Sequence, residues 1–472
     1  MIGIVVKKEL FETVGSKKFH ISFAVCSVLI LLAFYAGIRN HQNNVERYEA
    51  SKADNLRKLE GLKEWHEVEN YRIFLPPRPL ESLVGGVSND IGRTIVIQRG
   101  NELEAEGSRF GDDPVFAVFG FLDLEFIFQI VLTLFAILFA YDSVNGEKER
   151  GTLRLTFSNP IPKSSYILGK WTGSFVAVCL PLMIPLLTGC LMPPVLGVGL
   201  SGGEWLRLGL VILSGLLLFG AFLAMSIMVS VFTKRSSSSF LVLLVIWIFV
   251  ILIIPRTAVV LAARAVETPS VDELAAKKSS FARQLMMEDR EKVDGYRGSG
   301  GSDMEAMMRE FQEFMNGIQE ERRKKTDEYN ARLNEERRNK QIVQEKTAFG
   351  LARISPSATF TLAAASLART SLDQKERFLG EAGRYQETYG RFMLDKTGIA
   401  SGLRVIRISD GDREEGEAKA SIDPGEIPVF DFHEVSTAEC VKGSIPDMGL
   451  LLIFNLAFFA LAYFRFLRYD VR

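Results

Sequence analysis

The residue types that most often catalyse reactions or bind metals are sparse in this sequence. Its four histidines are His20, His41, His66 and His433. They stand far apart, and none has a cysteine at the spacing of a zinc site. No G-x-x-x-x-G-K-[S/T] phosphate-binding loop occurs, and the nearest fragment is Leu168-Gly169-Lys170-Trp171. The sequence therefore predicts no catalytic residue, no metal site and no cofactor bound by this chain, and it favours a protein that is not an enzyme.

Two acidic residues lie in a long apolar stretch, where charges are costly and often functional. Asp123 and Glu125 stand among Phe121, Leu122 and Leu124 near one end of that stretch. One interpretation is a polar contact for a cation or polar substrate at the outer mouth of a membrane pathway. The alternative, which we favour, is a helix start, because carboxylates stabilise the positive N-terminal end of a helix.

The most informative polar segment is the loop formed by residues 141–170. A charged helical turn leads to Gly151, which is expected to break the helix, and a second short helix is expected from Thr152 to the turn before Pro160. An amphipathic element of this kind lies along the membrane surface and can contact a cytoplasmic partner. The alternative is an interfacial hairpin without a partner. The candidate contact residues are Asn145, Glu147, Glu149, Arg150, Gly151, Thr152, Leu153 and Phe157.

The elements that must position this loop are six apolar stretches. The chain has 472 residues, of which 47% are hydrophobic, and a net charge of −1. The stretches cover residues 19–38, 114–140, 171–192, 208–231, 240–254 and 448–464. Such lengths match a bilayer core of about 30 Å at 1.5 Å per residue. The pattern excludes a soluble enzyme. The balanced net charge gives no positive electrostatic field that would attract nucleic acid. Four cysteines are too few for a disulfide framework. We expect the first stretch to be retained, because no small-x-small cleavage pattern follows it.

Basic residues in the short loops predict the orientation. With the N-terminus in the cytoplasm, the inner segments 1–18, 141–170 and 465–472 and the Lys234-Arg235 loop carry fourteen lysines and arginines. The short outer loop between the third and fourth stretches carries Arg207 alone. Both chain ends are therefore predicted to be cytoplasmic, in the cytoplasmic membrane of a bacterium or archaeon.

This orientation places two long insertions outside, residues 39–113 and 265–446. The second insertion contains a charged stretch, residues 320–346. An apolar stripe precedes it and is formed by Met307, Phe311, Phe314 and Ile318. The stretch could be a coiled coil that reaches a partner, but we favour the solvated helix of a compact domain. Short strands are predicted at 94–98 and about 403–408. The predicted fold class is an α-helical integral membrane protein with six transmembrane helices and a large, mainly α-helical extracytoplasmic domain, with a minor β part, in which both insertions pack together.

The loop resembles a family signature, the E-x-E-x-G-T-L pattern of type-2 ABC transporter permeases. Here it reads Glu147-Lys148-Glu149-Arg150-Gly151-Thr152-Leu153, followed by Pro160, Lys163 and Leu168-Gly169-Lys170. The chain is similar to a subgroup with a long insertion before the last span. The stretches that carry this likeness are Pro77-Arg78-Pro79-Leu80, Ser355-Pro356-Ser357-Ala358, Ile427-Pro428-Val429-Phe430 and the C-terminal Phe466-Leu467-Arg468-Tyr469-Asp470-Val471-Arg472.

The resemblance implies a permease subunit that pairs with a second permease, identical or related, and with two separate ATPase subunits that bind ATP and Mg. In that family the stretch corresponding to residues 145–158 sits in a groove on the ATPase and relays its closure to the spans. Family membership favours export of a substrate. The size of the outer insertions favours a second hypothesis, an ATP-driven machine whose external domain acts on a periplasmic protein or lipoprotein.

Overall fold

The computed structural model describes residues 2–60, 62, 65–68, 71–86, 92–97, 105–106, 122–296, 304–397 and 422–468. Six helical segments among these residues are long and apolar enough to cross a membrane: Lys17–Arg57, Leu124–Glu149, Lys163–Val195, Gly202–Phe232, Ser236–Ala265 and Thr437–Leu467. An α-helical membrane protein with six candidate spans is thereby confirmed. The chain divides into two compact units, one made of Met1–Leu252 and Ser355–Arg472 and the other of Ile253–Ile354.

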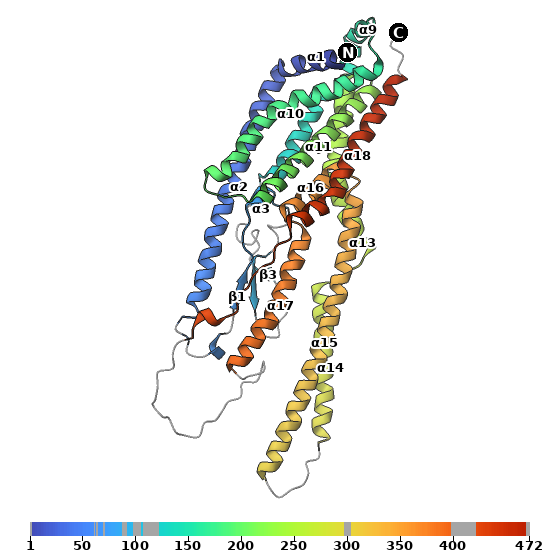
Figure 1. The fold of residues 1–472 in the computed structure, drawn as a ribbon. Coiled ribbons are helices and arrows are strands. Elements are labelled where there is room, and N and C mark those ends of the chain that lie inside the picture. Colours follow the sequence, from blue (N-terminus) through green and yellow to red (C-terminus); the bar gives the residue numbers. More distant parts are fainter. Residues whose placement is uncertain are drawn as a thin grey trace. The chain divides into compact units, whose positions relative to one another are not determined.

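The first unit is built on long helices that lie side by side. They are α2 (Lys17–Arg57), α10 (Lys163–Val195), α11 (Gly202–Phe232) and α18 (Thr437–Leu467), and α1 (Ile2–Val14) packs on α10. Serines begin three of them: the side chains of Ser16, Ser201 and Ser436 each accept a hydrogen bond from a backbone N–H in the first turn. Both described ends of the chain lie near α9 (Thr152–Phe157) at one end of these helices (Figure 1).

The second span is interrupted by a π-helical turn. It consists of α6 (Leu124–Phe126), the π-turn η2 (Ile127–Leu132) and α7 (Thr133–Ala140). The helix begins at Leu124, inside the predicted stretch 114–140, whose residues 114–121 lie outside the described residues. The fifth span has the same construction, with α12 (Ser236–Ile248), a π-turn (η3, Phe249–Ile253) and α13 (Ile254–Ala265).

The two insertions share a second apolar core within the first unit. The first insertion supplies a three-stranded antiparallel sheet of β1 (Tyr71–Phe74), β2 (Thr94–Ile97) and β3 (Ala105–Glu106), in which Tyr71 pairs with Ile97. The second supplies α17 (Leu372–Thr397). Helix α16 (Pro356–Ala368) packs instead against α11 and α18, in the core of the long helices. Ile73, Ile95 and Ile97 of the sheet cluster with Phe378 and Tyr389 of α17. The remaining short elements are η1 (Trp65–Glu67), α3 (Pro79–Leu83) and η4 (Pro424–Glu426).

The stretch that carries the apolar stripe belongs to the other unit, and packing of residues 265–354 against the first insertion stays a prediction. Helices α14 (Val271–Asp294) and α15 (Met304–Ala352) form an antiparallel pair. Phe281 stacks on Tyr329 with ring centroids 3.9 Å apart, and Lys292 pairs with Glu321 at 2.7 Å. The charged helix therefore has a partner within its own chain. The predicted strand at 403–408 and residues 469–472 of the C-terminal motif lie outside the described residues.

Candidate functional site

The 141–170 loop forms two short helices joined by a left-handed glycine. Helix α8 covers Asn145–Glu149 and α9 covers Thr152–Phe157. Gly151 between them has φ +72°, and a Cβ placed on it would find open space within 4 Å. The glycine is required by the backbone conformation, which L-residues adopt at a cost, and not by crowding. The predicted break at Gly151 is confirmed.

Glu147 of α8 is the centre of a buried ion-pair network. Its side chain lies 2.7 Å from the Lys8 ammonium of α1 and 2.8 Å from the Lys170 ammonium of α10. The Tyr166 hydroxyl donates a hydrogen bond of 2.6 Å to the second carboxylate oxygen. Lys170 also pairs with Glu9 of α1 at 2.6 Å. Because Glu147 is only 2% exposed, these charge-assisted contacts fasten the loop to both α1 and α10.

The Leu168-Gly169-Lys170 motif has a structural explanation in this network. A Cβ on Gly169 would lie 2.6 Å from the Cβ of Val5, so the missing side chain lets α1 approach α10 closely. One turn further along, Gly173 faces Glu9 in the same way, with its Cβ position 2.8 Å from that of Glu9. The two glycines bring Glu9 within reach of Lys170, and the motif's lysine then completes the ion pair.

Glu9, Glu12 and Glu147 bring carboxylate oxygens close enough together for a metal ion. Two ammonium groups already pair with this cluster, those of Lys8 and Lys170. Burial raises the pKa of Glu9, and the attraction of Lys170 opposes that rise. A network in which lysines compensate the acids accounts for these groups, so we interpret the cluster as a set of ion pairs.

Asn145 fastens the loop to the end of α11, and Glu149 fastens it to the start of the fifth span. The side-chain amide of Asn145 donates a hydrogen bond to the hydroxyl of Thr233 at 2.9 Å. The backbone N–H of Asn145 donates to the hydroxyl of Ser230 at 3.1 Å. Glu149 accepts hydrogen bonds from the backbone N–H and the hydroxyl of Ser236, at 3.0 and 2.7 Å. Ser236 is the first residue of α12, so α8 is hydrogen-bonded directly to that helix.

Aromatic rings join the loop to the C-terminal motif. The rings of Phe157, Tyr166 and Phe466 lie in mutual contact, with centroids 5.2 to 5.9 Å apart. The Lys163 ammonium donates to the backbone carbonyl of Leu467 at 3.2 Å. The structure thus brings together the two sequence stretches that carry the strongest family signature, although more than 300 residues separate Lys163 from Leu467.

The eight predicted contact residues divide into an inner and an outer set. Asn145, Glu147 and Leu153 are buried, Thr152 and Phe157 are half-buried, and Glu149, Arg150 and Gly151 are exposed. Contact with an ATPase stays a prediction for all eight. Sequence reasoning missed Leu155, which is 69% exposed on α9, and the inner partners Lys8, Glu9 and Lys170. The Lys8-Glu9 pair in a helical segment before the first span was the available signal.

The structure brings Asp123 to the start of the second span, where it caps the helix. One carboxylate oxygen accepts from the backbone N–H of Phe126 at 2.8 Å and the other from that of Gly85 at 3.1 Å. These contacts fit the favoured helix-start interpretation. Glu125 lies half-buried in the first turn, and its role as an outer-mouth contact stays a prediction.

Comparison with known proteins identifies the family. The sequence profile of the ABC-2 family transporter proteins matches residues 4–471. The chain belongs to the ABC-2 transporter family. It is 30% identical over 125 residues to a protein named "Probable ABC transporter permease protein NosY" from Stutzerimonas stutzeri, and 32% identical over 128 residues to the protein of the same name from Pseudomonas aeruginosa. Each match covers 26% of this chain and 45% of the relative, so the chain spans less than half the length of these relatives.

Proposed function

We propose that this chain is the permease subunit of an ABC transporter and couples ATP hydrolysis by separate ATPase subunits to export across the cytoplasmic membrane. The observation that carries the proposal is the two-sided arrangement of the α8–α9 loop. Its inner side is fastened to α1, α10, the start of α12 and the end of α18. Its outer side exposes Arg150, Arg154 and Leu155. ATP and Mg would be bound by the partner, in accord with the missing phosphate-binding loop.

In the proposed mechanism an ATPase moves the loop as one body. Movement of α8 pulls on α1 and α10 through Glu147, and on α12 through Glu149 and Ser236. Movement of α9 acts on α18 through Phe157 and Phe466. Buried charge pairs and packed rings resist stretching, because separating them exposes uncompensated charge or opens a cavity. Four helices of the first unit would therefore respond together.

Docking of the ATPase is tested by Leu155→Asp. Because burial of a leucine side chain contributes roughly 1.5–3 kcal/mol, the variant should reduce co-purification of the ATPase by about ten-fold or more. Val429→Asp is the matched control, since Val429 is also exposed, at 85%, but lies beyond η4, close to the second apolar core. Normal ATPase retention by Leu155→Asp would contradict docking at α9. Glu147 is unsuitable for this test, because reversing its charge would place a lysine beside Lys8 and Lys170.

The orientation is tested by labelling with a membrane-impermeant maleimide. All four native cysteines are buried, so the wild type should give a low background of labelling. For the same reason Cys440 cannot report the orientation, although it lies in an insertion that is predicted to be outside. Thr388→Cys on α17 should be labelled in intact cells, whereas Ser158→Cys at the end of α9 should be labelled only after permeabilisation; both positions are exposed. Labelling of position 158 in intact cells would reverse the proposed topology.

The alternative function, an ATP-driven machine acting on a periplasmic or lipoprotein partner, is favoured by α2. This helix has 41 residues and is therefore ~60 Å long, about twice the thickness of a bilayer core. Near its far end the Asn55 amide donates to the backbone carbonyl of Arg72 in β1 at 2.9 Å. A continuous helix could thus carry movement from the first span to the external sheet. Trapping either a translocated substrate or a bound external partner would separate the two functions.

We also propose that a second permease, identical or related, completes the transport pathway in the bilayer. The fifth span is the candidate contact, together with the first. Its α12 exposes Leu241 and Val245, and the adjoining π-turn η3 exposes Phe249. These side chains suit either lipid or another apolar helix. A monomeric permease in a complex with bound ATPase would contradict this arrangement.

A further inference from the structure

A separate pocket lies where α16 ends and where α17 and α18 begin. Its cavity has a volume of about 250 Å³ and is lined by residues of all three helices and by Arg78 and Phe432. Along α18, Cys440 in this pocket is 26 residues from Phe466, or ~39 Å, so the pocket is remote from the coupling loop. A cavity of this size suits a small ligand or the end of a larger one.

Three arginines and three carboxylates surround the pocket. Arg78 and Arg369 both pair with the single carboxylate of Glu434, so together they retain one positive charge. Arg377 pairs with Glu439 at 2.9 Å. Asp373, the other acid of the lining, offsets the remaining charge from an exposed position. The N-termini of α17 and α18, helices of 26 and 31 residues, add positive dipole ends.

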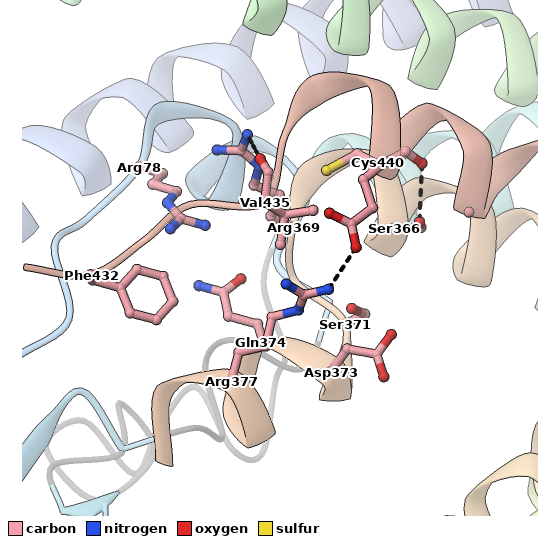
Figure 2. A pocket seen from close by; sticks show the side chains of 12 residues that line it. Arg78, Ser366, Arg369, Ser371, Asp373, Gln374, Arg377, Phe432, Val435 and Cys440 are labelled. Carbon is pink, nitrogen blue, oxygen red and sulfur yellow. Dashed lines mark hydrogen bonds and ion pairs between the residues drawn. The ribbon is translucent and has the colours of Figure 1, made fainter. Parts of the chain in front are cut away.

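Polar groups without partners point to a ligand at this place. Gln374 is only 6% exposed, yet both its amide nitrogen and its amide oxygen lack a hydrogen-bond partner among the described residues. One Nη of Arg78 and the Nε of Arg369 are likewise buried and unsatisfied within the described part of the chain. Figure 2 shows the Gln374 amide pointing toward the Phe432 ring and the Arg78 guanidinium. Leaving such groups unsatisfied costs about 1–3 kcal/mol each.

The free groups specify the chemistry of the ligand. Guanidinium N–H groups and the Gln374 N–H are donors that suit an anion, and carboxylates form strong paired hydrogen bonds with arginine. The free Gln374 oxygen accepts a hydrogen bond, so it suits an N–H or O–H beside that anion. Because Asp373, Glu434 and Glu439 offset the charges of the three arginines, the pocket favours a monoanion over the more highly charged phosphate. The Phe432 ring supplies an apolar wall. We propose that this pocket binds a carboxylate flanked by an N–H or O–H donor, as in an amino acid derivative or the C-terminus of a polypeptide.

Titration calorimetry on the full-length protein in detergent tests the site. N-acetylglycine should bind, whereas N-acetylglycinamide, which lacks the negative charge, should bind about ten-fold or more weakly. Acetyl-tetra-alanine with a free or an amidated C-terminus tests whether the ligand is the end of a polypeptide. Tighter binding of the free acid than of N-acetylglycine identifies a polypeptide end. Binding of N-acetylglycine alone identifies a small molecule. Absence of carboxylate binding, equal binding of acid and amide, or preferential binding of inorganic phosphate would each overturn the proposal.

Gln374→Glu is the decisive variant, because it keeps the shape of the side chain and adds a negative charge that repels a carboxylate. It should weaken N-acetylglycine binding by about ten-fold or more. Gln386→Glu makes the same change on the same helix, 12 residues or ~18 Å away, and should leave binding unchanged. Equal binding by both variants would contradict the site.

Protection of Cys440 supplies a measurement that needs no substitution. Cys440 lines the pocket and is buried, so N-acetylglycine should slow its alkylation by a permeant maleimide, as read by mass spectrometry. Cys26 lies in the core of the helices around α2 and should react at the same rate with and without the ligand. Unchanged alkylation of Cys440 at saturating N-acetylglycine would overturn the proposal.

Discussion

Lys170→Met is expected to destabilise the first unit strongly. Lys170 is buried and compensates both Glu9 and Glu147. Removing one partner of a buried ion pair leaves uncompensated charge and typically costs about 3–5 kcal/mol. The variant should therefore show a markedly lower melting temperature in detergent and easier proteolysis of α1. Lys7→Met, the same change at an exposed position of α1, should have little effect.

The pH dependence of the stability of Lys170→Met, together with a combined variant, separates the loss of charge compensation from the loss of packing. Burial raises the pKa of Glu9, and loss of Lys170 removes the main group that opposes this rise. Because a carboxyl with a raised pKa in the folded state binds protons on folding, stability falls as pH rises toward that pKa. The deficit of Lys170→Met should thus be smaller at about pH 5.5 than at about pH 8. Adding Glu9→Gln and Glu147→Gln should recover part of the loss, and an unchanged deficit would assign the effect of Lys170 to packing.

Gly151→Val should uncouple the complex while leaving it assembled. Gly151 has φ +72° in open space, so valine meets no clash, but a β-branched residue disfavours this conformation by roughly 1–3 kcal/mol. The chain should relieve that strain by changing the angle between α8 and α9. We expect permease-stimulated ATPase activity, or substrate-linked hydrolysis, to fall by about ten-fold.

Gly151→Asn is the matched control for that experiment, because asparagine tolerates the left-handed conformation. It adds a side chain at the same position and should retain most of the coupled activity. Retention of normal coupling by Gly151→Val would mean that the angle between the two short helices is unimportant and that the loop is an interfacial hairpin. Equal loss in both variants would instead assign the defect to added bulk at the docking surface.

The membrane architecture and the position of the loop could be predicted from residues that lie close together in the sequence. Apolar stretches about as long as a bilayer core is thick have few alternatives to spanning helices, since their backbone groups must be satisfied within the segment. The break at Gly151 follows from the same local physics, and so does the helix start at Asp123, where a carboxylate caps free N–H groups. Each of these features depends on residues within a few positions of one another.

The contacts of the polar residues in the loop could not be predicted in this way, because they depend on the tertiary structure. Glu147 reads as an exposed charge in a charged turn, and it is buried because Lys8 and Lys170 arrive from helices distant in sequence. The division of the second insertion at Ser355 depended on which core each part joins, and the pocket around Gln374 needs Arg78 from almost 300 residues away. The spacing of residues along the chain reveals the period of a helix or a strand. The partners that compensate a buried charge come from distant parts of the chain, and a single sequence does not show which residues pair.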